Sequence, residues 1–169
     1  MRIPKLPKAS KSYKHSKSAY LNGWSAPMVI SLVAIVRVIP AIITIPFPLI
    51  GWVLSIIADE LDYPILYAAG FHYDNYQKID KFFDQVQYLA LLIALLISPV
   101  PTQILIAATI LYFSRLLITP LAEFSRIKLL YLLIPNMFEF FAASYFILEA
   151  LGQDAMIILS PAFLICLYV

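Results

Sequence analysis

The feature that most constrains this chain is an apolar run from Met28 to Ala58, in which Arg37 is the only charged residue. A soluble domain of 169 residues cannot bury so much apolar surface. The run is also longer than the roughly 18 consecutive apolar residues that suffice for a membrane-spanning helix. The composition agrees, since only 13% of the residues are charged, against about 25% in soluble domains. We therefore predict an integral membrane protein and exclude a soluble enzyme, a secreted scaffold and a disordered tail.

The apolar tracts divide into lengths that match membrane crossings of about 20 helical residues. Pro46 and Pro48, followed by Gly51, predict a turn that splits the first tract. We predict an all-α bundle of six transmembrane helices over residues 27–169. The expected helices are Pro27–Ile45, Leu49–Ala68, Tyr76–Pro99, Thr102–Ala122, Lys128–Leu151 and Asp154–Val169.

The distribution of basic residues predicts the orientation of this bundle. Residues 1–26 are expected to form a basic cytoplasmic segment, because residues 1–24 hold half of the twelve Lys and Arg residues and no acid. The expected loops 69–75 and 123–127 have Lys or Arg in or beside them, whereas the expected external turns have none. A nucleic-acid-binding arm is the alternative interpretation of the basic segment, but we expect no nucleic-acid partner.

Four aspartates fall inside the second and third predicted helices. Asp59 and Asp62 lie in the cytoplasmic half of the second helix, and Asp80 and Asp84 in that of the third. Spacings of three and four residues place each pair on one helix face. Adjacent antiparallel helices can turn both faces toward one cavity. A carboxylate at the bilayer centre costs about 2.5 to 3.5 kcal/mol, so these acids need partners.

Two kinds of partner remain open for the four carboxylates. They could lie near the interface and pair with Lys78, Lys81 or Arg37. Alternatively, two divalent cations would neutralise them and leave coordination positions for phosphate oxygens. Ligands that are all oxygen favour Mg²⁺ or Mn²⁺ over zinc.

The spacing of the aspartates resembles the motif of the integral-membrane CDP-alcohol phosphatidyltransferases, also called CDP-alcohol phosphotransferases. That motif reads Asp, two residues, Asp-Gly, two residues, Ala-Arg, eight residues, Gly, three residues, Asp, three residues, Asp. The four acids stand in its register with offsets of 3, 18 and 4, out of only six aspartates in the chain. The resemblance implies a six-helix membrane fold, a site for two Mg²⁺ or Mn²⁺ ions on the second and third helices, and a homodimer.

The same resemblance implies an activity. A phosphatidyl-type group would move from a CDP-linked lipid, such as CDP-diacylglycerol, to an alcohol acceptor, with release of CMP in phospholipid synthesis. Asp59, Asp62 and Asp80 would mainly coordinate the metal. Asp84 would complete the metal site and deprotonate the acceptor as the catalytic residue. The enzyme would be a multi-pass membrane protein whose active site faces the cytoplasm.

Every position of the motif other than the aspartates differs in this chain. Tyr63 and Tyr76 stand at the two glycine positions, and Leu66 and Tyr67 replace the Ala-Arg pair. In the family, the glycines let the nucleotide approach the helix backbone. The tyrosines would therefore either contact the substrate in a reshaped pocket or end the binding of CDP compounds. An interfacial aromatic belt is the alternative interpretation of these tyrosines.

Four basic residues are candidate substrate contacts. Arg37 and Arg115 are expected near the depth of the aspartates, where a guanidinium can hold a phosphate through two hydrogen bonds. Arg115 could equally be a buried partner of Glu139 or of an aspartate. Arg126 and Lys128 are expected at the cytoplasmic mouth, where they would contact substrate or serve only as topology determinants.

Two further function classes stay open. A noncatalytic membrane protein would keep the fold and a divalent cation site, and the tyrosine replacements favour it. A cation transporter would also use intramembrane acids, but the chain lacks the symmetric helix breaks of transporter repeats. Asn136 and Glu139 of the fifth helix would line the same cavity or bond to neighbouring helices.

Overall fold

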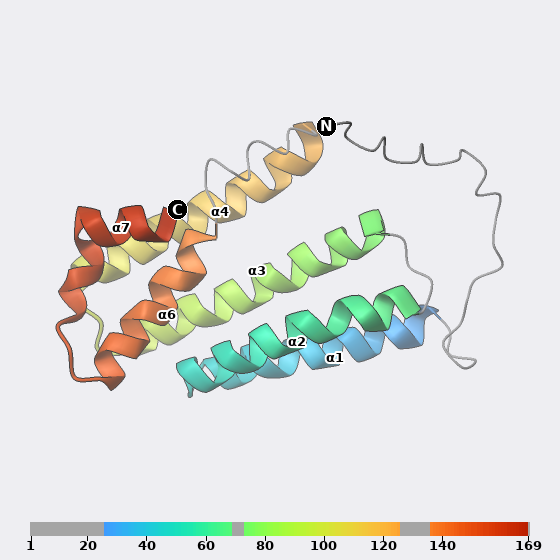
Figure 1. The fold of residues 1–169 in the computed structure, drawn as a ribbon, viewed down its shortest axis with the longest axis horizontal. Coiled ribbons are helices and arrows are strands. Elements are labelled where there is room, and N and C mark those ends of the chain that lie inside the picture. The colour runs from blue at the N-terminus through green and yellow to red at the C-terminus, as the bar shows by residue number, and fades with distance from the viewer. Residues whose placement is uncertain (1–25, 69–72, 126–135, 169) are drawn as a thin grey trace, which may run out of the picture.

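The computed structural model describes residues 26–68, 73–125 and 136–168, and every regular element within them is helical (Figure 1). The predicted all-α class is therefore confirmed for this part of the chain. The elements are α1 (Ala26–Thr44), α2 (Pro48–Ala68), α3 (Tyr73–Ile97), α4 (Thr102–Ser125), α6 (Met137–Ala150), the 3₁₀ helix η2 (Ala155–Leu159) and α7 (Pro161–Tyr168).

The long helices α1 to α4 lie lengthwise beside one another (Figure 1). Helix α1 packs most extensively against α2 and also contacts α3. Helix α6 contacts α2, α3 and α4, and η2 and α7 pack on α6. Helix α3 thus contacts four other helices, so its side chains join the α1–α2 pair to the rest of the bundle.

The first four expected helices are observed, with bounds that differ from the predicted ones by at most three residues. Pro46 lies between α1 and α2, so the predicted proline turn is confirmed, and Pro99 and Pro101 lie between α3 and α4. Of the expected fifth helix, the described part is α6 with 14 residues. Residues 1–25 of the expected basic segment 1–26 and residues 126–135 lie outside the described residues.

The expected last helix, Asp154–Val169, is wrong as a single helix. Asp154 caps η2, since its carboxylate accepts a hydrogen bond of 2.9 Å from the amide of Met156. Ser160 is then extended, with φ −67° and ψ 142°. The residue before a proline is driven out of the helical region, so Pro161 explains the break. The following helix α7 is described over 8 residues, Pro161–Tyr168, which is about 12 Å of helix.

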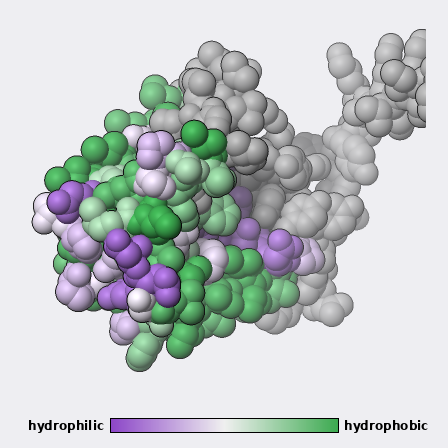
Figure 2. All heavy atoms as spheres, turned by 60° about the vertical axis from the view of Figure 1, so that its left-hand side comes forward, coloured by the Kyte–Doolittle hydropathy of each residue, from purple (hydrophilic) through white to green (hydrophobic). Residues whose placement is uncertain are grey.

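Two helical segments, Pro27–Thr44 and Thr102–Ala122, are long and apolar enough to cross a membrane. Helices α2 and α3 have similar lengths but contain the acids described above. Large apolar side chains are exposed along all four helices, among them Ile42, Phe82 and Leu117. Figure 2 shows a face of the molecule that is largely apolar, with polar residues gathered in a few patches. Such an exterior suits a hydrocarbon environment.

Two apolar clusters of different size form the interior. The larger one joins α3, α4, α6 and η2, and includes Leu91, Ile104 and Phe141. The smaller one joins α1, α2 and α3 through Val29, Val33, Leu66 and Phe83. Both clusters draw on α3, where Asp84, Gln85 and Gln87 separate Phe83 of the smaller cluster from Tyr88 of the larger one along the chain.

A close contact between Gly51 and Thr44 sets the geometry of the α1–α2 pair. A Cβ atom at Gly51 would lie 2.2 Å from Thr44 Oγ1 and 2.4 Å from its Cα. Thr44 is fully buried, and its hydroxyl donates a 2.9 Å hydrogen bond to the carbonyl of Pro40. The missing side chain at position 51 therefore lets α2 begin directly against the end of α1. The two helices then run side by side, which brings Arg37 beside the aspartates of α2.

Candidate functional site

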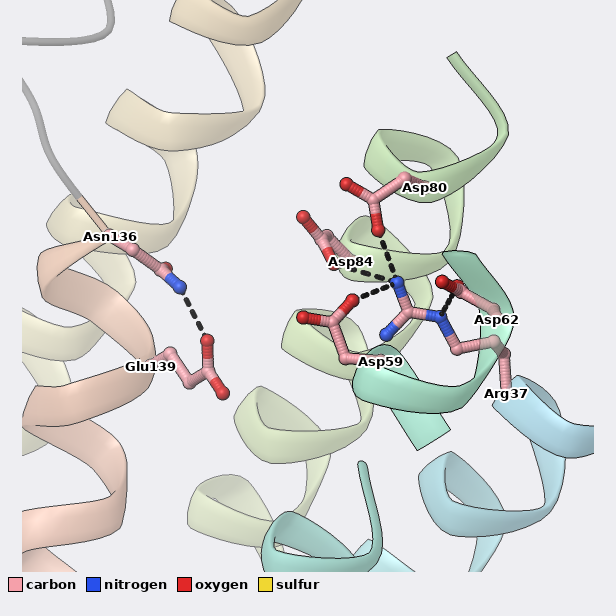
Figure 3. Close-up of polar contacts among 7 residues, drawn as sticks. All are labelled: Arg37, Asp59, Asp62, Asp80, Asp84, Asn136 and Glu139. Atoms are coloured by element: carbon pink, nitrogen blue, oxygen red, sulfur yellow. Dashed lines mark hydrogen bonds and ion pairs between the residues drawn. The ribbon is translucent and has the colours of Figure 1, made fainter. Parts of the chain in front are cut away.

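The four predicted aspartates surround the guanidinium of Arg37 (Figure 3). Arg37 extends from α1, Asp59 and Asp62 from α2, and Asp80 and Asp84 from α3. Nη2 of Arg37 lies 2.5 Å from Asp59 Oδ1 and 3.6 Å from Asp84 Oδ1, and it also contacts Asp80. Nε lies 2.8 Å from Asp62 Oδ2 and forms an ion pair with it, although its N–H does not point at this oxygen as a hydrogen bond requires. Three helices therefore converge on one charged cluster.

This cluster is closed on one side and open on the other. The side chains of Asp62 and Arg37 are 0% and 4% exposed. The side chains of Asp80 and Asp84 are 23% and 27% exposed, and that of Asp59 is 50% exposed. A ligand can therefore reach Asp59, Asp80 and Asp84, whereas Asp62 and Arg37 form the buried floor.

The charges within the cluster do not balance. Four carboxylates and one guanidinium leave these five side chains with a formal excess of negative charge. Buried charges in proteins are paired or coordinate metals. The excess therefore favours binding of an additional cation.

Asp59, Asp62 and Asp80 fit the requirements of a metal site. Each offers a carboxylate oxygen, and these oxygens lie within 4.8 Å of one another. Two oxygens on one ion are separated by at most twice the metal–oxygen distance, which is about 4.2 Å for Mg²⁺ and about 5 Å for Ca²⁺. The three aspartates could therefore hold a metal ion after a small closure of their side chains. Nη2 of Arg37 contacts two of them, so the guanidinium and an ion would compete for Asp59 and Asp80.

A cavity of about 100 Å³ lies beside the cluster. It is bounded by residues of α1, α2, α3 and α6 and by Asn136, the residue just before α6. Its lining consists of Arg37, Ser55, Ile56, Asp59, Asp84, Gln87, Tyr88, Asn136 and Glu139. The two aspartates of the lining are among the accessible members of the cluster.

Glu139 lines this cavity and also bonds to a neighbouring helix. Both of the roles predicted as alternatives for this residue are therefore observed. Its Oε1 accepts a 3.0 Å hydrogen bond from Trp52 Nε1 on α2, and its Oε2 accepts one from Asn136 Nδ2. Figure 3 shows Glu139 and Asn136 on the opposite side of the site from the aspartates. Glu139 therefore fastens α6 to α2 at the edge of the cavity.

Sequence reasoning missed two residues that shape the site. Gln87 donates a 3.0 Å hydrogen bond from Nε2 to Thr44 Oγ1 and so joins α3 to α1 beside the cavity. Its position three residues after Asp84, on the same helix face, was the available indication. Trp52 had no such indication, because its partner Glu139 lies 87 residues away in the chain.

The remaining predicted residues are placed as follows. Arg115 on α4 interacts electrostatically with Asp84 and Tyr88, in line with the interpretation that it is a partner of an aspartate. The backbones of Tyr63, Tyr67 and Tyr76 lie in α2 and α3, but their side chains lie outside the described part of the structure. The same holds for the whole of Arg126 and Lys128. Substrate contacts by these residues and by Arg37 stay predictions.

The site thus consists of a charged cluster that can hold a metal ion and an adjoining polar cavity. Comparison of the chain with known protein families, with curated proteins and with solved structures gives no significant match.

Proposed function

We propose that this chain is a membrane phosphotransferase that moves a phosphatidyl-type group from a CDP-linked lipid, such as CDP-diacylglycerol, to an alcohol acceptor and releases CMP. The observation that supports it most is the convergence of four aspartates with the family's spacing on one point. Three of them present oxygens within 4.8 Å of one another, which suits a metal-dependent reaction of phosphates.

The proposal includes a multi-pass arrangement with the N-terminus and the site on the cytoplasmic side. It is supported by α1 and α4, whose apolar segments are long enough to cross a membrane. The exposed apolar side chains of α1 to α4 also support it. In this arrangement α2 and α3 cross beside α1 and turn their acids toward one another, away from lipid. The segment after Asp154 is interrupted at Ser160, so the sixth crossing of the proposed bundle is not a single helix over Asp154–Val169.

Two Mg²⁺ or Mn²⁺ ions would neutralise the charge on the transferred phosphate. The residues that would hold them are Asp59, Asp62, Asp80 and Asp84. The acceptor hydroxyl oxygen forms a bond to the lipid-side phosphorus, and the bond from that phosphorus to the bridging oxygen breaks. CMP departs with the bridging oxygen. Asp84 faces the cavity and takes the hydroxyl proton.

The test is release of CMP by the purified protein in lipid or detergent with CDP-diacylglycerol, Mg²⁺ and a panel of alcohols. The Asp84→Asn variant should lower the rate by a factor of about 100 or more, because it removes the proton acceptor. Glu149→Gln is the matched control, since Glu149 is an exposed acid of α6 that does not line the cavity. CMP release by the parent no faster than by Asp84→Asn, with both proteins folded, contradicts the proposal.

A noncatalytic membrane protein with a divalent cation site is the second candidate. It is favoured by Arg37, which provides all four acids with a common counterion within the fold. This candidate predicts saturable Mg²⁺ or Mn²⁺ binding without CMP release from any alcohol. The measurement of metal binding beside the CMP assay therefore separates the two candidates.

A further inference from the structure

The cavity beside the aspartate cluster is better suited to a cation than to an anion. Asp59, Asp84 and Glu139 line it with three carboxylates, and Arg37 is the cation of the lining. The Arg37 side chain is 4% exposed and already contacts four aspartates. It is therefore a poor partner for a phosphate that enters the cavity. Since opposite charges attract and like charges repel, this lining favours a positively charged ligand.

Gln87 adds a buried acceptor to this lining. The residue is 4% exposed, and its Nε2 donates to Thr44 Oγ1. The Thr44 hydroxyl already donates its proton to the Pro40 carbonyl, so it can only accept from Gln87. This fixes the orientation of the amide. Gln87 Oε1 then remains buried, with no hydrogen-bond partner among the described residues.

Asn136 repeats this arrangement on another side of the cavity. Its Nδ2 donates to Glu139 Oε2, and because a carboxylate only accepts, the orientation of this amide is fixed as well. Asn136 Oδ1 is buried and has no hydrogen-bond partner within the described segments. Buried acceptors are ordinarily met by a donor from protein, water or ligand. The cavity therefore needs a ligand that is rich in donors.

We propose that this cavity binds the primary ammonium group of a small amino alcohol, which is the acceptor in the transfer reaction. An ammonium carries one positive charge and three N–H donors, which match the carboxylate of Glu139 and the amide oxygens of Gln87 and Asn136. The cavity volume is about 100 Å³, which limits the ligand to a small molecule. Because it names the acceptor, this inference rests on the proposed function.

The first experiment measures binding alone, without the lipid donor. Purified protein is titrated calorimetrically at neutral pH with ethanolamine, with ethylene glycol, with choline and with glycerol 3-phosphate, all in saturating Mg²⁺. Ethylene glycol replaces the ammonium by a hydroxyl, and choline keeps the charge but has no N–H donor. Ethanolamine is expected to bind at least tenfold more tightly than each of the others. If ethanolamine binds no more tightly than the other three ligands, or does not bind at all, the inference is overturned. The cavity would then hold water.

Saturating Mg²⁺ is included because ethanolamine could otherwise act as a simple counterion of the aspartates. If raising the Mg²⁺ concentration displaces ethanolamine completely, the ammonium occupies the metal site and the inference is overturned. Persistence of binding at saturating Mg²⁺ supports a separate ammonium position in the cavity.

The second experiment removes one charge of the lining without changing its shape. Glu139→Gln is expected to weaken ethanolamine binding at least tenfold and to leave ethylene glycol binding unchanged. Glu149→Gln on the same helix is the control and should bind both ligands as the parent does. An unchanged affinity of Glu139→Gln for ethanolamine contradicts the inference. Should this variant fail to fold, because Glu139 also holds Trp52, the ligand comparison on the parent protein still decides.

The CMP assay separates failure of this inference from failure of the proposed function. CMP release with ethanolamine, and little with a neutral or phosphorylated alcohol, supports both. Release only with a neutral or phosphorylated alcohol supports the function and overturns the inference. Selective binding of ethanolamine without CMP release from any alcohol overturns the function and supports the cavity as an ammonium site.

Discussion

The two halves of α3 meet their neighbours by different forces. In residues 80–87, Asp80 and Asp84 form ion pairs with Arg37, and Gln87 hydrogen-bonds to Thr44. In residues 88–95, the larger apolar cluster of α3, α4, α6 and η2 instead takes up Tyr88, Leu91, Leu92, Ala94 and Leu95. Apolar packing is insensitive to ions, whereas the energy of a charged cluster depends on the cations that occupy it. Sensitivity to metal should therefore be confined to the polar half.

The largest effect is expected where α6 packs on the apolar half of α3. Phe141 is fully buried in the larger cluster, so Phe141→Ala should lower the free energy of unfolding by about 3 to 5 kcal/mol. The loss should be the same in Mg²⁺ and in EDTA, measured by thermal or denaturant unfolding in detergent. The neighbouring Phe140→Ala is the control, because Phe140 is 49% exposed. A loss that changes with Mg²⁺ would remove the contrast between the two halves.

Arg37→Gln tests the polar half. Removing one partner of a buried ion pair costs about 3 to 5 kcal/mol. We expect about 3 kcal/mol in EDTA, near the lower end of that range, because Asp59 is half exposed. Mg²⁺ should restore part of this loss, since the ion takes over the neutralisation of the carboxylates and no longer competes with the guanidinium. Unfolding curves at increasing Mg²⁺ measure the recovery, and identical losses with and without the ion would refute this competition.

Gly51→Ala tests the contact that aligns α1 with α2. The new Cβ would lie 2.2 to 2.4 Å from Thr44 atoms, including its backbone, so one helix must move. We expect a loss of stability of about 2 to 3 kcal/mol, in the upper part of the range for overpacking, and a weaker response to Mg²⁺. Gly152→Ala is the control, because that position has φ +65° but open space around it. It should cost only about 1 kcal/mol and leave the Mg²⁺ response unchanged.

The smallest of these effects is expected for Trp52→Phe. The variant keeps the aromatic ring but removes the N–H that donates to Glu139, so stability should fall by about 1.5 kcal/mol. A double-mutant cycle with Glu139→Gln measures the coupling. Additive losses would mean that this hydrogen bond does not hold α6 against α2.

Much of the fold could be predicted from the sequence, because local features determine it. The length of the apolar runs predicts α1 to α4, and the proline pairs predict the break between α1 and α2 and the break between α3 and α4. The error in the last segment has a local cause as well, since Pro161 should have indicated a break at Ser160. The length and apolar character of residues 154–169 outweighed that indication.

The site could be predicted only in part. Spacings of three and four residues place Asp59, Asp62, Asp80 and Asp84 on two helix faces, and short connections bring the helices together. The hydrogen bond between Trp52 and Glu139 depends instead on how α6 crosses α2, which no periodicity records. No periodicity records the position of Arg37 either. Its guanidinium contacts four acids of α2 and α3 only because α1 packs against both helices.

The position of Arg37 on the first described helix has a consequence for biosynthesis. A ribosome delivers Asp59 and Asp62 soon after Arg37, and only later Asp80 and Asp84. The tight turn between α1 and α2, which the close contact of Gly51 with Thr44 permits, lets the earlier pair reach the arginine while the remainder is still being translated. In the proposed membrane arrangement, a cation that would be costly to leave unpaired in the bilayer thus has counterions from the moment the first hairpin forms.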